Sequence, residues 1–120
     1  MTDFLLLLAL SATPLPAPVD VAPQDSAPQL SLEHRMLVRC SAAFAMVAYG
    51  QASGQEDALR YPDMRERGEE FFIRASAQVM DEAGLDRAQI EAALTAEAQD
   101  LRDSNTLDDV MPACLALLPS

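Results

Sequence analysis

The chain has 120 residues, 50% of them hydrophobic, and its 19 acidic residues outnumber its 8 basic ones, which gives a formal net charge of −11. This length leaves room for one folded domain. Because so strong a negative charge repels phosphate backbones and anionic lipid headgroups, nucleic acids and membrane surfaces are disfavoured as partners.

Residues 1–12 have the pattern of a secretory signal peptide. An apolar run, Phe4–Leu10, is too short to cross a bilayer and is followed by the small, turn-forming residues 11–14. Two features depart from the usual pattern. Asp3 stands where a basic residue is common, and Leu10 occupies the third position before the expected cleavage point after Ala12, where a small residue is usual. We expect a periplasmic or secreted protein without a membrane anchor after cleavage. A cytoplasmic protein with an apolar N-terminus is the alternative.

Residues 13–29 form a proline-rich segment with no hydrophobic period. It contains more than half of the prolines of the chain: Pro14, Pro16, Pro18, Pro23 and Pro28. Such a composition cannot build a core, so it predicts an extended or disordered linker. The folded domain is therefore expected to cover residues 30–118.

Two helices are predicted in the first half of this domain. Ser31 is the expected N-cap of the first helix, which ends before Gly50 and is followed by a loop over residues 51–55. Pro62 is expected in the first turn of the second helix, where its missing N–H has no cost. The apolar stripes of the two helices consist of Leu37, Cys40, Phe44 and Val47, and of Met64, Gly68, Phe71, Phe72, Ala75 and Val79. On the outer face of the second helix, carboxylate–arginine pairs are predicted for Asp63 with Arg67 and for Glu70 with Arg74.

Two further helices are predicted after Gly84, which has the character of a left-handed helix end. Asp86 and Gln89 form a capping box for the third helix, whose inward side carries Ile90, Leu94 and Leu101. Thr106 is expected to cap the last helix. Pro112 fits that helix only near its first turn, so a kink or a restart at Met111 is expected.

These elements predict an all-α fold, a small four-helix bundle. Cys40 and Cys114 each lie on the apolar stripe of their helix, so both can point into one core and form a disulfide. On the chain-entropy model such a bridge stabilises a small domain by about 4–5 kcal/mol. Two buried free thiols are the alternative if the protein stays in the cytoplasm.

No residue pattern points to catalysis, a cofactor or a metal. His34 is the only histidine, and it lies near the start of a helix, so a surface position is expected. The adjacent carboxylates, such as Glu69 with Glu70, diverge by about 100° on a helix and cannot converge on one substrate. We therefore predict a protein that is not an enzyme, with no catalytic, cofactor-binding or metal-binding residues.

A candidate partner surface is predicted at Phe71, Phe72 and Ile73. Three consecutive bulky apolar residues on a helix cannot all face one core, so at least one is expected at the helix edge. There it would be available to a protein partner, an apolar ligand or a second copy of the chain.

Three functions remain open. The first is a small exported protein that binds a protein partner as an inhibitor, immunity-type protein or assembly factor, and the second is a carrier of an apolar small molecule. The third is an acid-responsive periplasmic chaperone. The expected protein is small, helical and linked by one disulfide between Cys40 and Cys114, and in this outline it resembles periplasmic acid-stress chaperones. Its many carboxylates would lose their charge as the pH falls.

Overall fold

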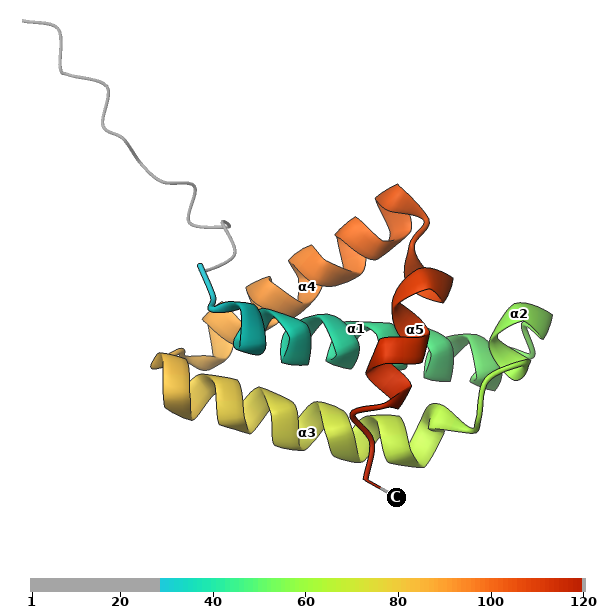
Figure 1. The fold of residues 1–120 in the computed structure, drawn as a ribbon, viewed down its shortest axis with the longest axis horizontal. Helices are drawn as coiled ribbons and strands as arrows, with labels where there is room; N and C mark the ends of the chain where they lie inside the picture. The colour runs from blue at the N-terminus through green and yellow to red at the C-terminus, as the bar shows by residue number, and fades with distance from the viewer. Residues whose placement is uncertain (1–28, 120) are drawn as a thin grey trace, which may run out of the picture.

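The computed structural model describes residues 29–119. The signal peptide predicted for residues 1–12, and all of the predicted linker except Gln29, lie outside the described residues. The described part consists of α1 (Leu32–Ala52), α2 (Glu56–Leu59), α3 (Met64–Ala83), α4 (Arg87–Ser104) and α5 (Leu107–Leu115). Figure 1 shows α1 in the middle of the helical domain, with α3 alongside it and α5 crossing in front of it. The predicted all-α fold with four main helices is confirmed.

Helix α1 begins as predicted and ends later than predicted. The Ser31 hydroxyl accepts a hydrogen bond from the backbone N–H of His34 at 3.2 Å, so it caps the helix. Gly50 does not end α1, which continues to Ala52. A Cβ atom at position 50 would lie 2.7 Å from the Cβ of Ala58. The glycine therefore permits close packing against α2, and this packing, invisible in the local sequence, is why the predicted helix end was wrong.

A buried amide organises the connection between α1 and α3. The Nε2 atom of Gln51 donates to the carbonyl oxygens of Ala58, Tyr61 and Pro62 at 2.9–3.3 Å, and its Oε1 atom accepts from the N–H of Met64 at 2.8 Å. One side chain thus satisfies backbone groups of α2, of the following loop and of the first turn of α3.

Helix α3 starts after Pro62 rather than with it, because Asp63 is the N-cap and Met64 is the first helical residue. The Asp63 carboxylate accepts from the backbone N–H of Arg65 and from its guanidinium. The predicted pair of Asp63 with Arg67 is therefore wrong, since the nearer arginine takes the carboxylate. Arg67 instead donates to the carbonyl oxygen of Pro119 at 3.2 Å. The predicted pair of Glu70 with Arg74 is present at 3.9 Å.

The corner between α3 and α4 agrees with the predicted signals. Gly84 has a φ of 66° in the left-handed region, and the Leu85 N–H donates to the Met80 carbonyl at 3.0 Å. The Asp86 and Gln89 side chains each accept a hydrogen bond from the other residue's backbone N–H, at 2.8 and 2.9 Å, which completes the capping box. Because the turn is short, α3 and α4 meet at this corner and diverge away from it (Figure 1).

Helix α5 differs from prediction at its cap, and it does not restart at Met111. Thr106 occupies the N-cap position, but its side chain makes no capping hydrogen bond. Its hydroxyl instead lies 2.8 Å from the Ser104 hydroxyl. Helix α5 runs through Pro112 without a restart at Met111. Pro112 removes only the bond to the carbonyl of Asp108, and both residues are exposed, so water can replace that bond.

The main core lies where α1 meets α3, α4 and α5. It is built from the disulfide, Phe44, Val47, Met64, Leu101 and Met111, all at most 1% exposed. The Phe44 ring contacts the Phe71 ring edge to face, with centroids 5.0 Å apart. A second cluster joins α1, α3 and α4 near the Gly84 corner and consists of Val38, Val79, Ile90 and Ala93. Among the described helices, none is both long enough and apolar enough to cross a membrane.

Candidate functional site

The disulfide between Cys40 and Cys114 is present as predicted. It joins α1 to α5 across a Cα–Cα distance of 5.2 Å, and both residues are fully buried. A bridge with no solvent-exposed surface is out of reach of an attacking thiolate, so its position is that of a structural link.

The three residues of the predicted partner surface point in three directions along α3. Phe71 is half-buried against Phe44, and Phe72 is half-buried in the wall of a groove on another side of the helix. Ile73 is 60% exposed. The structure therefore does not bring all three into one surface, and of the three only Phe72 lines the groove.

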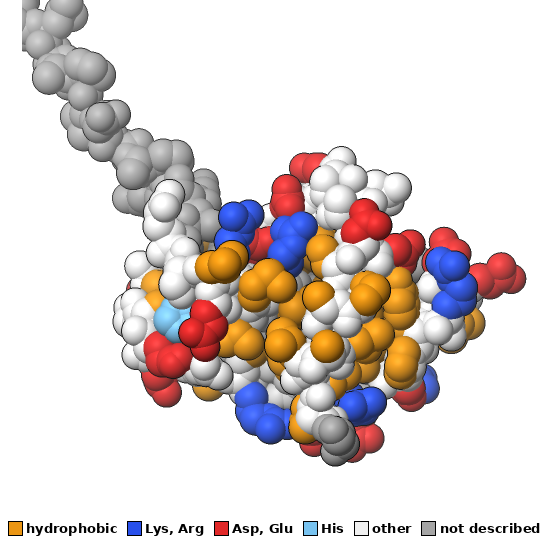
Figure 2. Space-filling model, in the orientation of Figure 1, with side chains coloured by type: hydrophobic (Ala, Val, Ile, Leu, Met, Phe, Trp, Pro, Cys, Tyr) orange, Lys and Arg blue, Asp and Glu red, His pale blue; other side chains and the backbone are white. Residues whose placement is uncertain are grey.

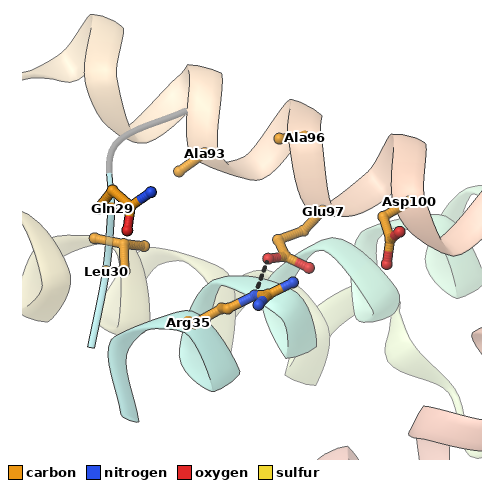
Figure 3. Close-up of a pocket in the computed structure, with 7 residues that line it drawn as sticks. All are labelled: Gln29, Leu30, Arg35, Ala93, Ala96, Glu97 and Asp100. Carbon is orange, nitrogen blue, oxygen red and sulfur yellow. Dashed lines mark hydrogen bonds and ion pairs between the residues drawn. The ribbon is translucent and has the colours of Figure 1, made fainter. Parts of the chain in front are cut away.

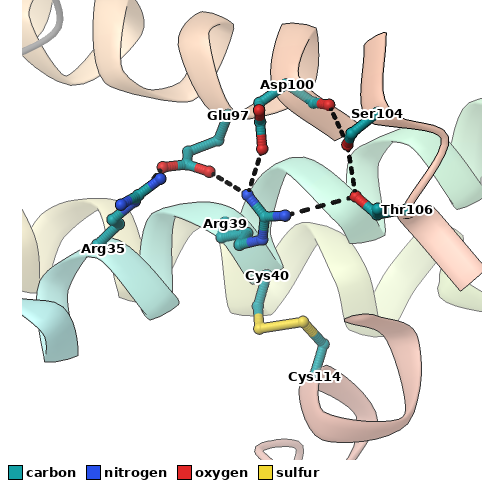
Figure 4. A network of polar contacts seen from close by, with 8 residues as sticks. All are labelled: Arg35, Arg39, Cys40, Glu97, Asp100, Ser104, Thr106 and Cys114. Atoms are coloured by element: carbon teal, nitrogen blue, oxygen red, sulfur yellow. Dashed lines mark hydrogen bonds and ion pairs between the residues drawn. A yellow bond between two sulfur atoms is a disulfide. The ribbon is translucent and has the colours of Figure 1, made fainter. Parts of the chain in front are cut away.

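A network of charged side chains ties α1 to α4 (Figure 4). Arg39 donates to Glu97 and to Asp100, each at 2.8 Å, and Arg35 donates to the other oxygen of Glu97 at 3.0 Å. The side chains of Arg39 and Glu97 are only 17% and 11% exposed. The hydrogen bond to Asp100, with a smaller contribution from Glu97, raises the pKa of Arg39 despite its burial. The network thus holds charged groups in one fixed arrangement between the two helices.

A polar cleft of about 300 Å³ lies beside this network, between α4 and the start of α1 (Figure 3). It is lined by Gln29, Leu30, Arg35, Ala93, Ala96, Glu97 and Asp100. Its charged side chains already have partners, because Arg35 pairs with Glu97, and Asp100 pairs with Arg39. The cleft therefore presents paired charges to a ligand and has no unpaired charged group in its lining.

An apolar groove of about 650 Å³ lies on the other side of α4, between α3 and α4, with α1 as its floor. The floor is a stripe of α1 at helical spacing, Ala42, Ala45, Met46 and Tyr49. Its walls and ends are formed by Gln55, Phe72, Leu94, Thr95, Ala98, Arg102 and Leu107. Because α4 diverges from α3 and no described element fills the gap, Ala45 stays exposed and Tyr49 is 73% exposed.

The groove and the disulfide occupy opposite sides of α1. Tyr49 follows Cys40 by two and a half helical turns, which places the two side chains about 180° apart. Sequence reasoning missed the groove because it assigned α1 a single inward stripe. The signal was present in the sequence, since Ala42, Ala43, Ala45 and Met46 leave this helix apolar on nearly every side.

The face that carries α5 is a second apolar area. Figure 2 shows hydrophobic side chains over the middle of this face, with acidic and basic side chains around them. The half-buried hydrophobic residues that pack on the core beneath include Met36, Val110, Leu115 and Leu118. These residues already cover the core, so this face is a closed side of the bundle rather than a gap in it.

Two further polar contacts lie away from the groove. The Tyr61 hydroxyl donates to the Asp108 carboxylate and links the loop before α3 to the start of α5. Burial, with a smaller contribution from Asp108, raises the pKa of Tyr61 to about 12. His34 is half-buried, not fully on the surface as expected, with Nε2 3.3 Å from Glu82 Oε1. Hydrogen bonds from Gln78 and then His34 lower the pKa of Glu82.

No group of three or more metal-ligating side chains comes together within residues 29–119. No protein-family model matches the chain, and neither the curated proteins nor the solved structures contain a detectable match to it. The functional argument therefore depends on the geometry of the groove.

Proposed function

We propose that this chain is a small, exported, non-enzymatic protein that binds a helix of a protein partner in the groove between α3 and α4. The observation that carries the proposal is the apolar stripe of α1 on the groove floor, of which Ala42 is buried and Met46 half-buried but Ala45 and Tyr49 are exposed. A helix that is apolar on nearly every side is normally surrounded by other elements. Helix α1 is covered by α3, α4 and α5 but open along Ala45 and Tyr49.

The shape of the groove favours a helix as its occupant. Its floor repeats at positions i, i+3, i+4 and i+7 of α1, the pattern of ridges and grooves that a second helix packs against. Alanines at positions 42, 45 and 98 allow a helix backbone to approach closely. At a rise of 1.5 Å per residue the floor is about 10 Å long, which corresponds to about two turns of a bound helix.

The buried disulfide supports the exported location, because such bridges form and persist in oxidising compartments. It also supports a binding role over a catalytic one. The bridge and the charged network fix α1 against α5 and α4, which keeps the floor of the groove rigid before a partner arrives and lowers the entropy lost on binding.

The test is selection of peptides from a displayed random library on the full chain with its disulfide formed. The proposal expects enriched peptides with apolar residues at i, i+3, i+4 and i+7, and it expects Ala45→Glu, which places a charge on the groove floor, to abolish the enrichment. An equivalent charge at exposed Gln99, outside the groove lining, is the matched control and should leave it intact. Enrichment of the same peptides by Ala45→Glu would refute the groove as the binding site.

A carrier function is the second candidate, because the groove volume of about 650 Å³ lies within the range of small-molecule sites. Native mass spectrometry of protein purified from its own host tests it. A retained apolar molecule that Ala45→Glu removes would favour the carrier, and a clean protein mass would count against it.

A further inference from the structure

The arginines of this chain differ in whether they have partners. Arg35, Arg39, Arg60, Arg65 and Arg74 form ion pairs, and Arg67 donates to a backbone carbonyl. Of the arginines within residues 29–119, Arg87 and Arg102 are the two with neither an ion pair nor a side-chain hydrogen bond.

Arg102 lines the apolar groove, and Arg87 does not. Arg102 lies in the last turn of α4, at the wide end of the gap between α3 and α4. The side chains that line the groove beside it are apolar or uncharged: Ala42, Ala45, Met46, Tyr49, Gln55, Phe72, Leu94, Thr95, Ala98 and Leu107. The groove lining therefore has one charged group, and that group is a cation.

We propose that the partner helix carries a carboxylate, from Asp or Glu, which pairs with Arg102 while its apolar face fills the groove. This inference rests on the proposed function and adds the charge and orientation of the partner. Apolar contacts alone let a helix bind in either direction. A single ion pair at one end of the groove favours one direction and one register, as charged positions do in other helix pairs.

Two other occupants fit less well. Two copies of this chain would each have a net charge of −11, and the repulsion between them opposes their association. A strongly basic helix would place its cations against the only charged group in the groove lining, which is itself a cation.

The test uses a library of displayed peptides in which apolar residues are fixed at i, i+3, i+4 and i+7 and the flanking positions are random. On the full wild-type chain we expect enrichment of Asp or Glu at one flanking position. Replacing that residue with Gln in the synthetic peptide should weaken binding roughly threefold to tenfold by calorimetry, as should Arg102→Glu in the protein. Arg87→Glu, the same charge change on the same helix outside the groove lining, should leave the affinity unchanged.

The decisive measurement is the charge exchange. Arg102→Glu combined with a peptide that carries Arg in place of its acidic residue should recover most of the lost affinity. Equal effects of Arg102→Glu and Arg87→Glu, or apolar peptides without an acidic preference, would overturn this inference and leave the helix-binding proposal standing. Failure to enrich any patterned peptide would overturn the helix-binding proposal itself. In that case, binding of dodecanoate that is sensitive to Arg102→Glu would assign the groove to a small amphiphile.

Discussion

On the side of α1 that faces α5, Cys40, Phe44 and Val47 are at most 1% exposed, whereas on the opposite side Ala45 is exposed and Tyr49 is 73% exposed. Both sides are apolar and belong to one helix, so composition does not explain the difference. The covered side has α3, α5 and a disulfide packed on it, and the open side has the gap left by the divergence of α4 from α3. The comparison indicates that one side of α1 stabilises the fold, whereas the other is exposed to solvent along Ala45 and Tyr49.

The covered side should be the more sensitive to truncation. Phe44→Ala removes a fully buried ring that contacts Phe71 and should lower the free energy of unfolding by about 3–5 kcal/mol. Phe72→Ala, in the half-buried wall of the groove, should lower it by about 1 kcal/mol. Urea unfolding of both variants measures the contrast, and Phe44→Leu replaces the first variant if it does not fold. Equal losses would show that the two sides do not differ as described.

The disulfide should be the next largest contributor. It closes a loop between residues 74 positions apart, and its removal by Cys40→Ala with Cys114→Ala should lower the free energy of unfolding by about 2–5 kcal/mol. Because the bridge is buried, the native protein should resist a mild reductant that reduces the urea-unfolded chain rapidly. Rapid reduction of the native protein would indicate that α5 opens readily and that the covered side is not closed.

A substitution at Gln51 tests how much the C-terminal end of α1 contributes to stability. Gln51→Met keeps the length of the side chain but removes the amide's hydrogen bonds to three carbonyl oxygens and to the Met64 N–H, and of the carbonyls Ala58 keeps a bond from the Tyr61 N–H. The free energy of unfolding should fall by about 1–3 kcal/mol. Gln55→Met, at an exposed position, is the matched control and should change it little. A stable Gln51→Met variant would mean that solvent satisfies these groups and that this end of the bundle is open.

The contact of Tyr61 with Asp108 on the covered side should make the free energy of unfolding depend on pH in the alkaline range. The folded pKa of Tyr61, about 12, exceeds its ordinary value of 10.0, so folding favours the protonated phenol. The resulting stabilisation is complete below pH 10 and is lost as the pH rises towards 12. In a Tyr49→Phe background, phenolate absorbance reports Tyr61 alone. Asp108→Asn should move the transition part of the way back, because burial remains the larger cause. An unshifted transition in the parent would contradict the contact.

The parts of the fold set by local rules were predictable from the sequence. The capping box of Asp86 with Gln89, the left-handed Gly84 and the cysteine positions each depend on neighbouring residues or on one apolar stripe. The groove was not predictable in this way, because it depends on the angle between α3 and α4, which is set by contacts distant in sequence. Arg39 and Glu97, for example, are 58 positions apart. Gly50 was misread for a different reason, because its close approach to Ala58 depends on how α2 folds back on α1 and not on a helix-end signal.

The substitution with the smallest expected effect on stability gives the clearest contrast between the covered and the open side of α1. Ala45→Glu should change the free energy of unfolding by less than about 0.5 kcal/mol, because the position is exposed and the carboxylate can reach water. The same substitution should abolish peptide binding, since a helix seated in the groove would have to desolvate that charge. A residue of a recognition surface is expected to behave in this way, because its side chain contributes to binding and not to folding. If Ala45→Glu instead destabilised the fold as much as Phe44→Ala, the open side of α1 would be part of the core.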